Sequence, residues 1–238
     1  MSRARAPADI EAILLDIEGT TTPISFVYEV LFPFARRHLA DHIDAHAHSL
    51  EYTRIFDALR EEREADIEAS AEAPPASITA YCEWLMDRDR KSTALKELQG
   101  KIWEEGYARG DLVGEVYPDV PPALVRWDTQ GRSLAIFSSG SVLAQQLLFR
   151  HSSAGDLSGF LRWYFDTTTG AKGESDSYRR IAGSIGVETG RALFVSDVTR
   201  ELDAARTAGM DTRLAIRPGN SPTPDNGHIV IRTFDDLG

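Results

Sequence analysis

Four short, almost continuously apolar segments constrain the fold of this chain more than any other feature. Helical patterns separate them, and polar or glycine residues bound each one. Strands that are apolar throughout, rather than at alternate positions, are typical of a parallel sheet covered on both faces. The segments are AILLDI (12–17), SLAIFSS (133–139), ALFVSD (192–197) and TRLAIR (212–217), with WYFD (163–166) as a candidate fifth. This alternation predicts an α/β fold with a doubly wound parallel sheet.

The stretch from about Phe26 to Arg109 has a different character. It has a helix-forming composition, many charges and no convincing strand, and EAPPAS (72–77) interrupts it. We predict an insertion of about four helices after the first strand. Open parallel sheets bind ligands at the carboxyl ends of their strands, so a helical insertion leaving there would act as a lid. The predicted domains are an α/β core, 1–24 and 116–238, and a helical cap, 25–115.

Charge narrows the possible partners. The 238 residues include 26 lysines and arginines against 37 aspartates and glutamates, for a formal net charge of −11. Such an acidic chain repels nucleic acid and anionic membrane, so we expect neither as a partner. A small anionic substrate would then need a local cation, either a metal ion or a placed lysine.

The single cysteine, Cys82, rules out an intrachain disulfide, which fits a reducing cytoplasm. We interpret Cys82 as a small apolar side chain on a helix rather than as a nucleophile. The N-terminal MSRARAPADIE has no apolar segment and predicts no secretory signal. We expect a cytoplasmic monomer, because no coiled-coil pattern or apolar stripe calls for a second subunit.

Two carboxylates follow the first apolar strand, in the stretch LLDIEGTTTP (14–23). Asp16 ends the strand, Glu18 comes two residues later, and Gly19 permits a turn. A carboxylate can attack phosphorus to form an aspartyl-phosphate, and a second carboxyl group nearby can protonate the leaving oxygen. A loop of solvated acids at a strand end is the alternative, and DIEGT alone does not decide between the two.

A further pair of acids follows another apolar strand. Asp197 ends it, and Glu201 comes one helical turn later. Mg²⁺ prefers one or two carboxylates together with water and phosphate oxygens, and Asp16 and Asp197 at neighbouring strand ends would suit it. Taken alone, Asp197 is better explained as the cap of a helix that begins near Thr199, and capping and metal binding do not exclude each other.

Two more motifs suit a phosphate group. FSSGS places Ser138 and Ser139 at a strand-to-helix junction, where hydroxyl and backbone N–H groups can meet an anion, although Ser141 is equally an ordinary helix cap. Lys172 lies in TGAKGES, where glycines let the chain bring an ammonium group close to a ligand. A lone lysine is usually a solvated surface residue, so Lys172 gains weight only from the motifs around it.

Taken in order, these motifs resemble those of the haloacid dehalogenase superfamily along the whole chain, and the helical insertion resembles its cap. The common superfamily pattern is D-x-D-G-T, whereas this chain has Glu18 in place of the second aspartate. DIEGTTTPISFV, SSGS, GAKGESDSY and SDVTRELDAA together resemble the enolase-phosphatase family of the methionine salvage pathway.

That resemblance implies a specific reaction. The substrate would be 2,3-diketo-5-methylthiopentyl-1-phosphate, which is enolised and then dephosphorylated to the acireductone 1,2-dihydroxy-3-keto-5-methylthiopentene, with Mg²⁺ as cofactor. Asp16 would be the nucleophile and a metal ligand. Glu18 would bind the metal through its backbone carbonyl and act as general acid. The resemblance also assigns Asp197 to the metal, and Ser138, Ser139 and Lys172 to the phosphate.

Three alternatives remain. A generic small-metabolite phosphatase of the same superfamily would use identical catalytic residues without enolisation. A haloacid dehalogenase proper would need neither Mg²⁺ nor a general acid at position 18. A non-catalytic phosphate-binding module would be expected to lack Asp16, Glu18 or Asp197, and all three are present.

Two features of the insertion point less clearly to function. His38, His42 and His46 recur every fourth residue, a spacing that can bind metal on one helix face, but on a charged helix we favour a solvated face. The aromatic residues are expected to pack the helices, and one of them to meet the methylthio group: Tyr81, Trp84, Trp103 and Tyr107.

Overall fold

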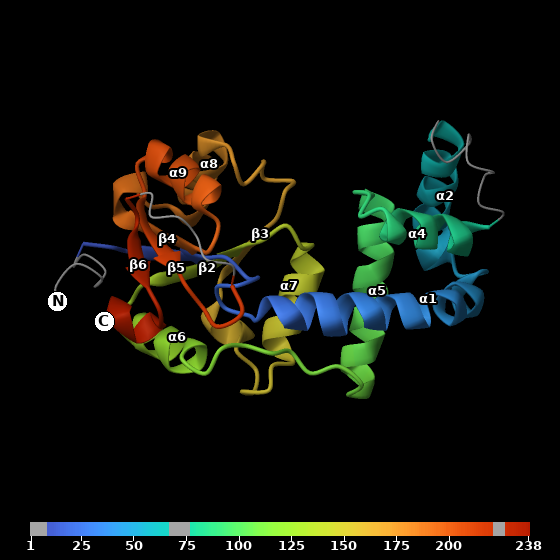
Figure 1. Cartoon of the computed structure of the whole chain (residues 1–238), viewed down its shortest axis with the longest axis horizontal. Helices are drawn as coiled ribbons and strands as arrows, with labels where there is room; N and C mark the ends of the chain where they lie inside the picture. Colours follow the sequence, from blue (N-terminus) through green and yellow to red (C-terminus); the bar gives the residue numbers. More distant parts are fainter. Residues whose placement is uncertain (1–8, 67–76, 221–226) are drawn as a thin grey trace. The chain divides into compact units, whose positions relative to one another are not determined.

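The computed structural model describes residues 9–66, 77–220 and 227–238. The chain divides into two compact units, one of Met1–Tyr28 with Val113–Gly238 and the other of Glu29–Leu112. The first contains the sheet and the second is helical (Figure 1). The assignment of core and cap domains, with boundaries at 24/25 and 115/116, stays a prediction. Most of EAPPAS, residues 72–76, lies outside the described residues.

The sheet has six parallel strands in the order β3-β2-β1-β4-β5-β6. This confirms the predicted doubly wound fold, including the candidate strand at WYF. One strand, β6, was not predicted, because three residues at the sheet edge are too short for a recognisable pattern. The strands are β1 (Ala12–Leu15), β2 (Ser133–Phe137), β3 (Trp163–Phe165), β4 (Ala192–Ser196), β5 (Asp211–Ala215) and β6 (Ile229–Ile231).

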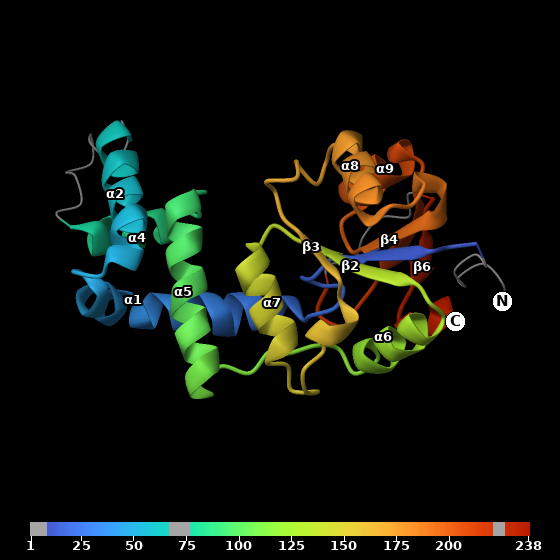
Figure 2. The ribbon, with the colours of Figure 1, turned by 180° about the vertical axis from the view of Figure 1, so that it is seen from behind.

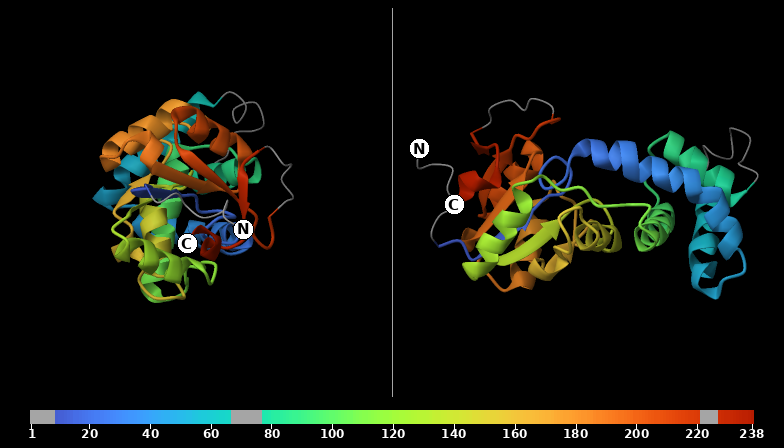
Figure 3. Two further views of the ribbon diagram at one scale, coloured as in Figure 1. Left: turned by 90° about the vertical axis from the view of Figure 1, so that its left-hand side faces the viewer. Right: turned by 90° about the horizontal axis from the view of Figure 1, so that it is seen from below.

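Helices cover both faces of this sheet, which explains why its central strands are apolar throughout. Every residue of β1 and β4 is buried. Helices α8 (Ser175–Ile185) and α9 (Thr199–Ala208) lie on one face, and α6 (Val120–Thr129) and α7 (Val142–Arg150) on the other (Figures 1 and 3). The described part of this unit also contains three short 3-10 helices: Ser158–Phe160, Thr189–Arg191 and Phe234–Leu237.

The second unit consists of helices that pack on one another. A π-helix, Phe26–Leu31, leads into α1 (Phe32–His46), which crosses α5 (Thr93–Arg109) (Figure 2). Helices α2 (Leu50–Ala65) and α4 (Ile78–Asp87) are the other described helices of this unit, with α2 packed against both α4 and α5. None of the helices that the structure describes is long and apolar enough to cross a membrane.

Side chains inside the helical unit test several sequence-based interpretations. Tyr81, Trp103 and Tyr107 are buried, as predicted, and Trp84 is half-buried with its ring stacked on Tyr81. Cys82 is fully buried, and burial raises the pKa of its thiol to about 12, so it is a packing residue and not a nucleophile.

The prediction of a solvated histidine face on α1 is wrong. His42 is buried, His46 is half-buried, and His38 is half-buried with its ring against Phe34. The reason is tertiary: α1 packs against α4 and α5, and the ring of Tyr52 from α2 lies against His42 and His46. Charge pattern alone does not show which helix face a neighbour will cover.

Candidate active site

The chain reverses its direction across the sheet at β1, with β2 and β3 on one side and β4 to β6 on the other. Ligands of doubly wound sheets bind beyond the carboxyl ends of the strands at such a switch point. The register pairs Leu15 of β1 with Val195 of β4, so Asp16 and Asp197 follow neighbouring strand ends. The candidate site therefore lies where the fold class predicts a ligand.

Three donors hold the carboxylate of Asp16 in one orientation, although the residue is almost completely buried. Its Oδ1 accepts hydrogen bonds from the backbone N–H of Ile17 at 2.8 Å and from the ammonium group of Lys172 at 2.7 Å. Its Oδ2 accepts from the hydroxyl of Ser196 at 2.8 Å. A carboxylate held this way keeps a fixed direction for attack on a ligand above the strand ends.

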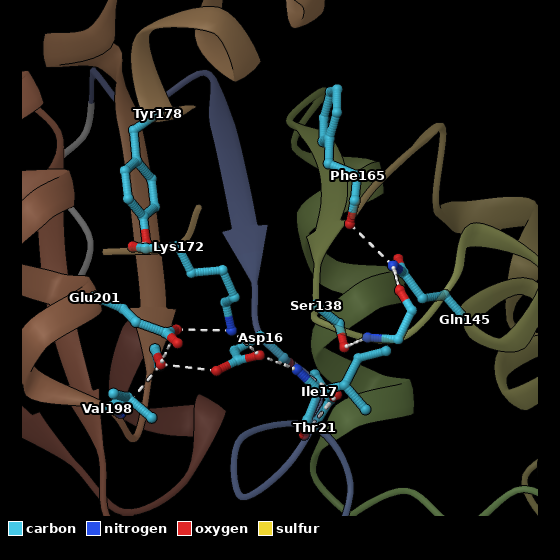
Figure 4. Close-up of polar contacts among 12 residues, drawn as sticks. Asp16, Ile17, Thr21, Ser138, Gln145, Phe165, Lys172, Tyr178, Val198 and Glu201 are labelled. Atoms are coloured by element: carbon cyan, nitrogen blue, oxygen red, sulfur yellow. Dashed lines mark hydrogen bonds and ion pairs between the residues drawn. The ribbon is translucent and has the colours of Figure 1, made fainter. Parts of the chain in front are cut away.

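Lys172 is buried rather than solvated, being only 7% exposed. Its Nζ lies 2.7 Å from an oxygen of Asp16 and 2.7 Å from Oε2 of Glu201, between the two acids (Figure 4). The hydroxyl of Tyr178 donates to the backbone carbonyl of Lys172 at 2.7 Å and anchors this segment. Burial lowers the pKa of Lys172, but the charges of Asp16 and Glu201 outweigh burial and raise it, so the ammonium form is held.

Asp197 packs against the loop that follows β1. A Cβ built on Gly19 would lie 2.2 Å from Oδ2 of Asp197, so only glycine leaves room for this carboxylate. Gly19 also has φ +68°, which glycine adopts without strain. The prediction that Asp197 caps the helix at Thr199 is wrong: α9 begins after Val198, without a side-chain cap. The carboxylate of Asp197 therefore makes no capping hydrogen bond to the first turn of α9.

Burial and the charge of Asp16 raise the pKa values of Asp197 and Glu201. Burial, followed by the charge of Asp16, raises the pKa of Asp197 to about 7, and Glu18 adds to the effect. Burial and the charge of Asp16 likewise raise the pKa of Glu201 to about 7, against the opposing charge of Lys172. One lysine thus leaves the cluster short of positive charge, a condition that a bound cation would relieve.

Glu18 lies in the turn after β1, where it forms a bridge with Thr22, and it is half-buried. The turn is closed by the backbone N–H groups of three threonines, all of which donate to the carbonyl of Ile17: Thr20, Thr21 and Thr22. The hydroxyl of Thr21 also donates to the carbonyl of Asp16 at 3.0 Å. Glu18 thus belongs to a braced turn beside Asp16 and Asp197.

The serine motif follows β2, next to β1 in the sheet. Ser138 is buried and Ser139 is exposed. Part of the predicted anion-binding backbone is already used, because the N–H of Ser138 donates to Phe165 and that of Gly140 donates to Oγ of Ser138. The hydroxyl hydrogen of Ser138 can still be donated to a ligand. Ser141 caps α7 by accepting from the N–H of Ala144, as predicted.

Two side chains complete the site without having been assigned to it from the sequence. Ser196 accepts from the N–H of Val198 and donates to Asp16, while Oε2 of Glu201 lies 3.3 Å from its oxygen. Gln145 is buried on α7 and donates to the carbonyls of Gly140 and Phe165, which ties the serine loop to β3 (Figure 4). Ser196 directly precedes Asp197, and this position next to a strand-end acid is the sequence feature that could have assigned Ser196 to the site.

This site and fold define a class of enzyme. The model of the haloacid dehalogenase-like hydrolase family matches residues 10–209, a range that contains every site residue described above. The chain therefore belongs to the haloacid dehalogenase-like hydrolases.

Comparison with individual proteins narrows the class. A protein named enolase-phosphatase E1 from Synechococcus elongatus is 50% identical over 237 residues, covering 97% of this chain and 99% of the relative. Another from Sorangium cellulosum is 49% identical over 226 residues, covering 95% and 96%. The crystal structure of the UTR4 protein from Saccharomyces cerevisiae has a TM-score of 0.80 at 35% identity, covering 96% of this chain and all of that one. Within its class, the chain belongs to the enolase-phosphatase E1 family.

Proposed function

We propose that this chain is a Mg²⁺-dependent enolase-phosphatase of methionine salvage. It would convert 2,3-diketo-5-methylthiopentyl-1-phosphate to 1,2-dihydroxy-3-keto-5-methylthiopentene and phosphate. The observation that carries the proposal is the buried group of Asp16, Lys172 and Glu201 beside Asp197 at the switch point of the sheet. The names of relatives at about half identity over nearly the whole chain support the choice of reaction.

The residues at the strand ends fit a magnesium ion. Mg²⁺ takes oxygen ligands. The absence of a side chain at Gly19, in the turn after Asp16, leaves space for the carboxylate of Asp197. In this proposal Asp16, Asp197 and the backbone carbonyl of Glu18 hold the ion. When bound, Mg²⁺ supplies positive charge for phosphate and carbonyl oxygens and relieves the repulsion among the acids.

Asp16 would act as the nucleophile. Its Oδ2 attacks phosphorus, the bond from phosphorus to the ester oxygen breaks, and an aspartyl-phosphate forms. Glu18 would give a proton to the departing oxygen and then take one from the water that hydrolyses the acyl-phosphate. The hydrogen bonds from Ile17 and Lys172 keep Oδ1 in place during both steps.

Lys172 would serve both the enolisation and the dephosphorylation. Its ammonium group is held in the charged form, so it can stabilise a phosphate oxygen and the negative charge that develops on a carbonyl oxygen during enolisation. Enolisation makes the later leaving oxygen part of an enol, which is less basic and departs more easily. The hydroxyls of Ser138 and Ser139 would complete the phosphate contacts.

A single variant separates the two reactions. Asp16→Asn keeps an oxygen for the metal but cannot form an acyl-phosphate. In D₂O with Mg²⁺, we expect this variant to exchange the carbon-1 hydrogens of the diketo phosphate while releasing no phosphate. Lys172→Ala should lose both exchange and phosphate release. Proton NMR follows the exchange, against a control without enzyme.

The competing function is a small-metabolite phosphatase without enolase activity. Exchange by Asp16→Asn no faster than the control, with Mg²⁺ shown to be bound, would favour that function. The same proposal describes the protein as a cytoplasmic monomer and its helical unit as the cap domain of the enzyme.

A further inference from the structure

The helical unit contains a second cluster of chemically active side chains. His42 and His46 lie one turn apart on α1, and Glu105 comes from α5, which crosses α1. One nitrogen or carboxylate oxygen from each residue lies within 4.8 Å of the others. His42 is buried, whereas the side chains of His46 and Glu105 are 27% and 36% exposed, so the helices cover the cluster only in part.

Each histidine faces its own oxygen of the same carboxylate. Nδ1 of His42 lies 3.4 Å from Oε2 of Glu105, and Nε2 of His46 lies 3.3 Å from Oε1. Charged hydrogen bonds between nitrogen and carboxylate are shorter, at about 2.7–2.9 Å. Ligand atoms around one tetrahedral zinc ion are roughly 3.3 Å apart, given bonds of about 2.0–2.1 Å. The two nitrogen–oxygen distances, each to a different oxygen of Glu105, are longer than such hydrogen bonds and are compatible with an ion held between the groups.

The tautomer of His46 also suits a metal ligand. Its Nδ1 lies 2.9 Å from the backbone carbonyl of His42, which can only accept a hydrogen bond, so Nδ1 carries the hydrogen. In the neutral ring, the lone pair is then on Nε2, which points toward Glu105. A carbonyl that fixes the ring through its other nitrogen is the usual support of a metal-bound histidine.

We propose that His42, His46 and Glu105 form a binding site for a divalent transition-metal ion, with Zn²⁺ as the best-matched ion. The two histidines have the i, i+4 spacing that places both on one helix face. Imidazole and carboxylate ligands together suit zinc, and a water molecule would occupy the fourth position. Because the ligands come from α1 and α5, the ion would join two helices of this unit.

The surroundings support this assignment. The ring of Tyr52 from α2 packs on both imidazoles, with centroid distances of 4.2 Å to His46 and 5.3 Å to His42. Burial of His42 lowers its pKa, which favours the neutral imidazole that binds metals. Nδ1 of His42 is the nitrogen that faces Glu105, and its Nε2, buried without a hydrogen-bond partner, would carry the ring hydrogen when Nδ1 binds an ion. Arg109 also approaches Oε2 of Glu105, at 3.5 Å, and is the cation that an ion would have to outcompete.

The test is zinc binding by the full-length protein while excess Mg²⁺ occupies the oxygen ligands of the strand-end acids. Protein freed of metal by a chelator is titrated with Zn²⁺ by calorimetry, and with Co²⁺ by visible absorption. We expect one equivalent of Zn²⁺ to bind, and Co²⁺ to give the intense bands of a four-coordinate site. The thermal midpoint should rise with Zn²⁺, because the ion binds the folded state.

The variants give this test its specificity. The double variant His42→Gln/His46→Gln should lose more than about 100-fold in zinc affinity, because even the loss of a supporting partner costs about 10- to 100-fold. Glu105→Gln, which keeps the side-chain shape, should show a similar loss. His48→Gln is the matched control, since His48 is exposed two residues beyond His46 and should bind Zn²⁺ like the parent protein.

Circular dichroism establishes that each variant is folded. If the double variant does not fold, then His46→Gln, at a half-buried position, and Glu105→Gln carry the comparison. Two results would overturn the proposal: no zinc binding in the presence of Mg²⁺, or zinc binding of unchanged affinity in the folded variants. Either would mean that the cluster is a proton-sharing ion pair. Both readouts are independent of phosphate release, so they do not depend on the proposed function.

Discussion

At the scale of single residues, the candidate site is a set of side chains whose charges depend on one another. Lys172 would be an unfavourable buried cation without Asp16 and Glu201, and those acids would be unfavourable buried anions without Lys172. Because each partner is held by the others, replacing one should change the position and the protonation of the rest. One substitution below examines this dependence, and another examines the proposed general acid.

Glu18→Gln tests the role of general acid. The variant should slow phosphate release from an alkyl phosphate by roughly 10²- to 10⁴-fold, because that leaving oxygen needs a proton. With p-nitrophenyl phosphate, whose leaving group needs no proton, the rate should fall by less than about tenfold. Steady-state rates with the two esters provide the comparison. Equal losses would instead assign Glu18 to positioning or to metal binding.

Glu201→Gln tests the positioning of Lys172, since Glu201 touches that lysine and is not proposed to touch the substrate. We expect kcat to fall by about 10- to 100-fold, a range typical of a misplaced reacting group. The two negative neighbours of Lys172 raise its pKa, so removing one should lower it and move the alkaline limit of activity to lower pH. A pH–rate profile measures this shift. An unchanged profile with reduced activity would mean a structural role only.

At the scale of elements, the turn after β1 links the sheet to its chemistry. Asp16 directly follows the strand, and the turn folds back through bonds to the carbonyl of Ile17. Asn220, in the loop after β5, donates to the carbonyl of Gly19 at 2.9 Å. The turn is thus fixed from two sides, and the space that it leaves beside Gly19 contains the carboxylate of Asp197.

Gly19→Ala should therefore impair the site as well as the fold. A positive φ with a Cβ costs about 1–2 kcal/mol, and the new methyl group would also displace Asp197. Gly131→Ala is the matched control, because Gly131 has φ +75° and open space where its Cβ would be. Both variants should lose stability in denaturant unfolding, but only Gly19→Ala should bind Mg²⁺ more weakly. Equal magnesium affinities in the two variants would contradict the placement of Asp197.

At the scale of the whole molecule, an acidic chain is proposed to act on an anionic phosphate ester. The net charge of −11 disfavours the approach of such a substrate, and the acids at the strand ends add to the repulsion. Lys172 is the one lysine that contacts these acids in the described structure, against the carboxylates of Asp16, Asp197 and Glu201. Activity in this chain should therefore depend on an added cation.

Removal of the metal should abolish phosphate release by this protein. EDTA is expected to reduce the rate to background and Mg²⁺ to restore it, because Asp16 and Asp197 otherwise repel each other and the substrate. A phosphate assay with and without chelator measures this. Full activity in EDTA would remove the magnesium proposal and return attention to a dehalogenase-like reaction.

The sequence by itself determined the class of fold and the identity of the proposed chemical groups. Continuous apolar strands predict a covered parallel sheet, and carboxyl ends of neighbouring parallel strands meet at one edge. Acids placed directly after the strands, such as Asp16 and Asp197, must therefore meet as well. The apolar strands and the acids that follow them are each recognisable within a few consecutive residues, which is why the sequence alone predicts them.

Only the tertiary structure decided how these groups are paired and which faces are buried. Three features depend on residues distant in sequence. Lys172 contacts Glu201, the backbone N–H of Ser138 donates to the carbonyl of Phe165, and packing of other helices buries His42. Helical periodicity shows that His42 and His46 share a face, but it does not show that α5 brings Glu105 to that face. Such pairing depends on how separate elements pack, and burial then sets the charge that each group carries.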